Sequence, residues 1–137
     1  TSVMLPVTTV VCLITALSMS LIGWTPKWPA QGGIWALNNL LLVTLTEELI
    51  FRGYLQGGLT RLLKRVPYHQ TLALLFASLA FGLSHLGAGW QWAVLAGISG
   101  LGYGIAYRFG GLPAAVITHF GLNLAHFSLF TYPMFDR

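Results

Sequence analysis

Apolar residues fill five long segments of this chain, and turn-forming or charged residues separate each segment from the next. The segments run over residues 3–23, 34–64, 70–86, 90–109 and 112–130. At about 1.5 Å of rise per residue, most of them are long enough to cross a hydrocarbon core of roughly 30 Å. Pro113 falls in the first turn of the last segment, where a helix tolerates proline. The pattern predicts an all-α fold, a polytopic transmembrane helical bundle with about five membrane helices.

The composition agrees with a chain surrounded by lipid. Apolar residues make up 55% of the 137 residues and charged residues only 7%, too little charge to cover a water-soluble domain. We expect one membrane-embedded domain over residues 1–137. The first residue is Thr1, which leaves room for upstream helices that this sequence lacks, and the first segment has no basic region typical of a signal peptide. The single cysteine, Cys12, is expected to be a small buried hydrophobe.

Basic residues lie mostly in the gaps between apolar segments. Arg61, Lys64 and Arg65 share one gap and Arg108 ends another segment, a pattern typical of cytoplasmic loops and unlike a nucleic-acid-binding surface. If the segments alternate in direction, the opposite side receives all five tryptophans, which prefer the membrane interface: Trp24, Trp28, Trp35, Trp90 and Trp92. The sequence predicts an integral membrane protein, with membrane lipid around it, no nucleic-acid partner and a cytoplasmic N-terminus.

Few ionisable side chains fall inside the apolar segments. They are Glu47, Glu48, Arg52, His85, His119 and His126. An ionised side chain costs about 2.5 to 3.5 kcal/mol at the bilayer centre on insertion scales, so such residues are seldom present for packing alone. Glu48 and Arg52 are four residues apart, in the order that favours an ion pair on one helical face.

The same spacing of four residues recurs in two later segments. It joins Phe81 to His85 and His119 to Asn123. Because polar groups in lipid must face one another or water, we expect the three helices to direct these side chains into one cavity.

A carboxylate beside an imidazole can deprotonate a water molecule, while an amide and a second imidazole can stabilise an oxyanion. This chemistry indicates peptide-bond hydrolysis without a serine or cysteine nucleophile. No segment contains His-Glu-x-x-His, the motif of many zinc proteases. Zinc or another divalent metal is still a possible cofactor, and its candidate ligands are Glu47, Glu48, His85 and His119.

Three motifs in this order resemble those of the intramembrane CAAX prenyl endopeptidase and bacteriocin-processing family, also called CPBP or Abi. They are Glu-Glu-x-x-x-Arg at 47–52, Phe-x-x-x-His at 81–85 and His-x-x-x-Asn at 119–123. The resemblance implies that Glu47 and His85 activate water and that His119 and Asn123 stabilise the oxyanion. It implies that Glu48 and Arg52 support the site. The resemblance covers about residues 34–130, which it implies to be the catalytic core. The family is commonly classed with metalloproteases. So short a chain resembles a bacterial member, which implies a bacterial plasma membrane.

Two alternatives to an endopeptidase are compatible with the same residues. One is a non-catalytic peptide-binding or bacteriocin-immunity membrane protein, and the other is a proton-coupled transporter. For the endopeptidase, the expected substrate is a peptide or a protein's C-terminal tail near the cytoplasmic face. His126 is interpreted as a packing or hydrogen-bonding histidine. Small residues at 53 and 57, and at 97, 100 and 104, predict close helix contacts.

Overall fold

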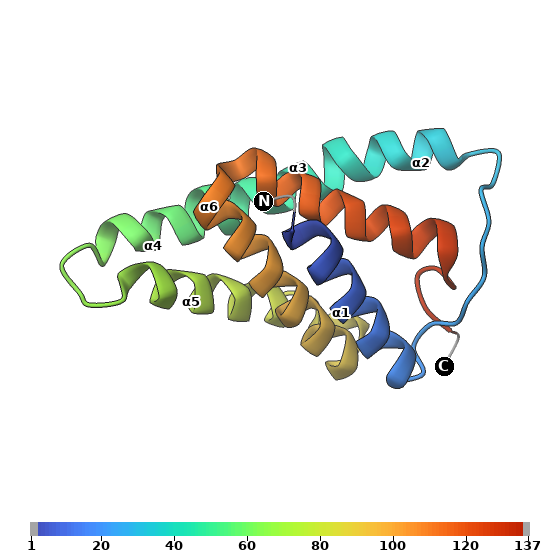
Figure 1. The fold of residues 1–137 in the computed structure, drawn as a ribbon, viewed down its shortest axis with the longest axis horizontal. Coiled ribbons are helices and arrows are strands. Elements are labelled where there is room, and N and C mark those ends of the chain that lie inside the picture. The colour runs from blue at the N-terminus through green and yellow to red at the C-terminus, as the bar shows by residue number, and fades with distance from the viewer. Residues whose placement is uncertain (1–2, 136–137) are drawn as a thin grey trace.

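The computed structural model describes residues 3–135, and all of its regular elements are helices (Figure 1). The helices, in chain order, are α1 (Met4–Ser18), α2 (Gly32–Asn38), η1 (Asn39–Thr44), α3 (Leu45–Glu48), η2 (Leu49–Gln56), α4 (Gly57–Leu62), α5 (His69–Leu83), η3 (Leu86–Ala88) and α6 (Trp90–Leu129). Elements α2 to α4 form one uninterrupted helical run whose η1 and η2 parts are wider π-helical turns. Within the described part of the chain, the only extended pairing is an isolated bridge between Trp24 and Phe130.

Helix α6 is two helices joined at a kink. Gly111 has φ 73° and ψ −168°, a backbone conformation that side chains with a Cβ rarely adopt. Pro113 follows in the first turn after the kink, where its missing N–H costs nothing. With α6 divided there, five helical segments correspond to the five apolar segments of the sequence. The first is shorter than predicted, because α1 ends at Ser18 and an irregular connection follows.

Two of these segments are long and apolar enough to cross a membrane. They are the helical run Gly32–Leu62, with 31 residues, and His69–Ala88, with 20 residues. Only 17% of the most apolar window of the first is buried within the described structure, so its apolar side chains face outward, unlike those of a soluble core helix. Helix α1 has 15 residues, short of the roughly 20 that a span needs. The helical membrane character is therefore supported, while the number of five spans stays a prediction.

The kinked helix α6 lies at the centre of the bundle. It packs against α1 and α5, and also against the π-helical parts of the long run (Figure 1). A layer of Phe81, Ala96 and Tyr103 forms a buried cluster between α5 and α6, and Phe51 of the long run packs against it. This arrangement brings motifs that are far apart in the sequence to one place.

Glycines allow the closest of these helix contacts. A Cβ on Gly82 would lie 2.9 Å from the Ala93 carbonyl oxygen and 3.1 Å from the Cα of Gly97, so the backbones of α5 and α6 touch there. A Cβ on Gly104 would meet Leu74 and Gln56, which confirms the predicted contact at that position. The same prediction is wrong at Gly53, where a Cβ would meet nothing within 4 Å.

Candidate active site

A buried ionic network joins the long helical run to the second half of α6. Glu48 and Arg52 are both 0% exposed, and Arg52 Nε lies 3.3 Å from Glu48 Oε2 in an ion pair that lacks hydrogen-bond geometry. The other carboxylate oxygen of Glu48 lies 2.7 Å from His119 Nδ1, and Arg52 Nη2 donates a hydrogen bond of 2.8 Å to the Gly100 carbonyl. Glu48 therefore fixes the orientation of both the arginine and the imidazole.

Two aromatic rings complete the surroundings of this network. The Arg52 guanidinium lies over Phe81 at 4.7 Å and near Tyr103 at 5.4 Å from the ring centres. Tyr103, which is 1% exposed, stacks on the His119 imidazole with ring centres 4.3 Å apart and planes 12° apart. Phe81 was predicted from its motif, whereas Tyr103 was not predicted. Nothing in the sequence distinguishes this tyrosine from the others, because its role depends on how α6 folds back at Gly111.

His85 is held by the end of its own helix. Its Nδ1 lies 2.8 Å from the Phe81 carbonyl oxygen, which only accepts hydrogen bonds, and 3.1 Å from the Ser84 hydroxyl. In the neutral imidazole, Nδ1 therefore carries the hydrogen and Nε2 keeps a free lone pair. The Phe81 ring also contacts the His85 ring, with centres 4.7 Å apart. The spacing of four residues thus fixes both the position and the tautomer of this histidine.

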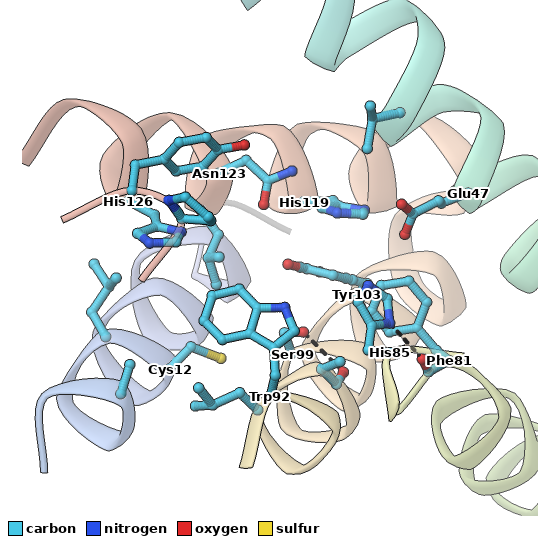
Figure 2. A pocket seen from close by; sticks show the side chains of 18 of the residues that line it. Cys12, Glu47, Phe81, His85, Trp92, Ser99, Tyr103, His119, Asn123 and His126 are labelled. Carbon is cyan, nitrogen blue, oxygen red and sulfur yellow. Dashed lines mark hydrogen bonds between the residues drawn. The ribbon is translucent and has the colours of Figure 1, made fainter. Parts of the chain in front are cut away.

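Glu47 lines a cavity of about 260 Å³ together with His85, His119 and Asn123 (Figure 2). One of its carboxylate oxygens, Oε2, is buried and has no hydrogen-bond partner within the described structure. Buried carboxylate oxygens are nearly always hydrogen-bonded, so this oxygen is suited to accept a hydrogen from a molecule in the cavity. The four residues predicted as catalytic therefore border one cavity.

Asn123 is positioned by two polar residues of the long helical run. Its Nδ2 donates to Asn39 Oδ1 at 3.1 Å and approaches Thr44 Oγ1 at 3.5 Å. Thr44 in turn donates to the same Asn39 oxygen at 3.1 Å. Asn39 and Thr44 were not predicted from the sequence, because uncharged polar residues inside an apolar segment carry little signal; the structure shows that both are buried.

The remaining wall of the cavity comes largely from apolar residues and reaches α1. Figure 2 shows Cys12, Trp92 and His126 away from the end that holds Glu47. Cys12 is 5% exposed, as predicted for a small hydrophobe, but it belongs to the cavity wall outside the predicted core of 34–130. His126 bonds through Nε2 to the Thr131 carbonyl at 3.0 Å, which confirms the interpretation as a hydrogen-bonding histidine.

The possible metal ligands do not form a complete site as the side chains are placed. Among residues 3–135, no three His, Cys, Asp or Glu side chains lie close enough together to hold a metal ion. His119 Nδ1 is already engaged by Glu48, and His85 Nδ1 by the Phe81 carbonyl. The proposed set of Glu47, Glu48, His85 and His119 thus does not fit a metal in this arrangement. Metal dependence stays a prediction.

One known protein family matches most of this chain. The family model described as type II CAAX prenyl endopeptidase Rce1-like matches residues 29–125, a range that contains all three motifs. The chain belongs to this family. The resemblance inferred from the motifs is thereby confirmed, and this Rce1-like protein is a member of a family of membrane proteases. No curated protein and no solved structure matches the chain.

Proposed function

We propose that this Rce1-like protein is an intramembrane endopeptidase that hydrolyses a peptide bond with water activated by Glu47 and His85. The observation that carries the proposal is the buried Glu47 oxygen without a partner, in a cavity that His85, His119 and Asn123 also line. Membership in the Rce1-like family independently supports protease activity. The expected substrate is a peptide or a C-terminal tail near the cytoplasmic membrane face.

Water activation needs acceptors for hydrogen bonds, and the cavity offers two. Glu47 presents an unpartnered oxygen, and His85 presents its Nε2 lone pair because Nδ1 donates to the Phe81 carbonyl. A water held between them would attack the carbonyl carbon of the substrate and give its proton to the Glu47 carboxylate. The same proton would then pass to the nitrogen of the leaving amine as the carbon–nitrogen bond breaks. The carboxylate is regenerated, and the other water hydrogen remains on the new carboxylic acid.

Oxyanion stabilisation falls to His119 and Asn123. When His119 is doubly protonated, Nδ1 donates to Glu48 and Nε2–H is free to donate to the substrate oxygen. The adjacent Arg52 adds positive charge near the developing oxyanion. The Asn123 Nδ2 amide donates one hydrogen to Asn39 and makes only a long contact with Thr44. Its second hydrogen would therefore be donated to the oxyanion.

The arrangement of the helix ends supports the proposed orientation in a bacterial plasma membrane, with the N-terminus of this chain in the cytoplasm. Arg61 and Arg108 line a common cavity, as expected if their loops lie on one side of the membrane. Trp24 contacts Phe130, just after α6, and Trp28 contacts Phe127 in the last turns of α6. Both contacts lie at the other end of the long helical run from the basic loop (Figure 1). Positive charge at one end and tryptophan at the other agree with a cytoplasmic basic loop.

The proposal is tested by incubating detergent-purified protein with a peptide library and identifying the products by mass spectrometry. Glu47→Gln keeps the shape of the side chain but removes the base, so cleavage should fall by about 10²- to 10⁴-fold. Arg65→Gln, an exposed change in the basic loop, serves as a control and should cleave as the wild type does. Cleavage by Glu47→Gln at the wild-type rate would refute the proposed role of this glutamate.

Two further readouts extend the same experiment. A chelator added to the wild type tests the predicted metal dependence: loss of cleavage that zinc restores would support a metalloprotease. If the folded wild type cuts no peptide but retains one on a column, the peptide-binding or immunity alternative replaces the endopeptidase. Proton flux in liposomes would instead support the transporter.

A further inference from the structure

A second cavity lies at the basic end of the bundle, away from the site described above. Its volume is about 470 Å³, and it is bordered by the end of the long helical run, the start of α5 and the kink of α6. The polar side chains in its wall are Gln56, Thr60, Arg61, Gln70, Tyr107 and Arg108. In Figure 1 this is the end at which the turn between α4 and α5 lies.

The charge in this wall is positive. Arg61 and Arg108 both line the cavity, whereas the two carboxylate side chains within residues 3–135, Glu47 and Glu48, belong to the other site. Arg108 Nη1 donates a long hydrogen bond of 3.4 Å to the neutral Thr71 hydroxyl, and its guanidinium lies 5.5 Å from the centre of the Phe109 ring. Two like charges in one cavity repel each other, so binding an anion there is electrostatically favourable.

The donors in this wall suit a phosphate group. A guanidinium offers a planar fork of N–H donors that matches phosphate oxygens, and this cavity has two of them. The Tyr107 hydroxyl reaches over the long helical run, because a Cβ on Gly57 would lie 2.7 Å from it. The Gln70 amide adds a further donor group to the same wall.

The surroundings of the cavity resemble a membrane interface. The aromatic side chains of Tyr54, Tyr68 and Phe109 are 80%, 83% and 74% exposed near this end of the helices. Exposed aromatic residues beside basic residues are typical of the depth at which lipid headgroups lie. Leu62, the last residue of α4, is 78% exposed and offers an apolar surface for an acyl chain.

We propose that the cavity between Arg61 and Arg108 binds a phosphate group, supplied by the headgroup of an anionic phospholipid. Phosphatidylglycerol has this chemistry. In phosphatidylcholine the phosphate is accompanied by a choline cation, which the two arginines repel. The proposal does not depend on the catalytic role of Glu47.

The test is native mass spectrometry of detergent-purified protein titrated with phosphatidylglycerol or phosphatidylcholine. The wild type should retain phosphatidylglycerol in preference to phosphatidylcholine. The double variant Arg61→Gln/Arg108→Gln should bind phosphatidylglycerol about 25-fold more weakly, because each basic residue near an anionic headgroup contributes about fivefold. The matched control Lys64→Gln/Arg65→Gln removes the same charge from residues outside the cavity wall and should weaken binding much less.

The titrations distinguish a lipid headgroup site, a free-phosphate site and the absence of an anion site. Equal weakening in the two double variants, or equal retention of both lipids by the wild type, would overturn the proposal. A titration with inorganic phosphate alone distinguishes the source: one phosphate bound with the same dependence on the two arginines would support the anion site but assign it to free phosphate. Should the glutamine variant fail to fold, Arg61→Lys/Arg108→Lys keeps the charge without the planar fork and should still weaken retention several-fold.

Discussion

Replacing Arg52 with methionine is expected to destabilise the protein more than any change on its surface. Methionine has a similar length but no charge, so it leaves the Glu48 carboxylate buried with His119 as its remaining partner. Removing one member of a buried ion pair typically costs about 3 to 5 kcal/mol, because the other charge loses its compensation. The change also removes the 2.8 Å hydrogen bond to the Gly100 carbonyl and the contacts with Phe81 and Tyr103.

These losses are not independent, so we expect a total of about 3 to 5 kcal/mol in the free energy of unfolding and not the sum of the separate terms. The double variant Glu48→Met/Arg52→Met removes both charges and leaves neither unpaired. It should therefore be less destabilised than the two single variants added together, by about 1.5 kcal/mol or more.

The assay is reversible unfolding in mixed micelles with increasing dodecyl sulfate, followed by circular dichroism. Arg65→Met provides the matched control, since Arg65 is an exposed arginine shortly after the same helical run and its replacement should change stability by no more than about 0.5 kcal/mol. Equal effects of Arg52→Met and Arg65→Met, or strict additivity in the double variant, would show that the buried pair does not hold the helices together.

Three further variants test the packing and the positioning of the site. Gly82→Ala places a Cβ against the backbone of α6 and should destabilise by about 1 to 3 kcal/mol in the same assay, whereas Gly53→Ala, which has open space, should be neutral or slightly stabilising. Asn39→Ala removes the oxygen that accepts the 3.1 Å hydrogen bond from the Asn123 amide, and it should lower kcat by up to about 10²-fold with little change in KM. An unchanged kcat would argue against a positioning role for Asn39. Tyr103→Phe keeps the ring that stacks on His119 and should retain cleavage, while Tyr103→Leu should lose most of it; equal rates would show that stacking does not orient the imidazole.

Much of the candidate site could be predicted because it depends on local spacing. Residues four apart on a helix share a face, which placed Glu48 beside Arg52 and the Phe81 carbonyl beside His85. The high cost of ionisable groups in lipid identified the residues that had to converge. Neither rule states which oxygen of Glu48 binds His119, or that the amide of Asn123 is held by Asn39.

The site residues that were not predicted from the sequence have no charge. Tyr103 and Asn39 are uncharged, so their presence inside apolar segments carried little signal, and each acquires its role from a partner far away in the sequence. The Gly100 carbonyl likewise gains its role from a distant partner, because it accepts a hydrogen bond from Arg52 on another helix. The contribution of α1 to the cavity wall also arises from packing alone.

By itself, the sequence determined the helical segments, the lipid-compatible composition and the three motifs that place the chain in the Rce1-like family. These features depend on side-chain chemistry and on periodicity within single helices. Only the tertiary structure decided that α6 turns back at Gly111, that Tyr103 covers His119, and that two arginines from separate segments share a second cavity. Those features require helices distant in the chain to meet, and their contacts depend on shape and depth that no local pattern specifies.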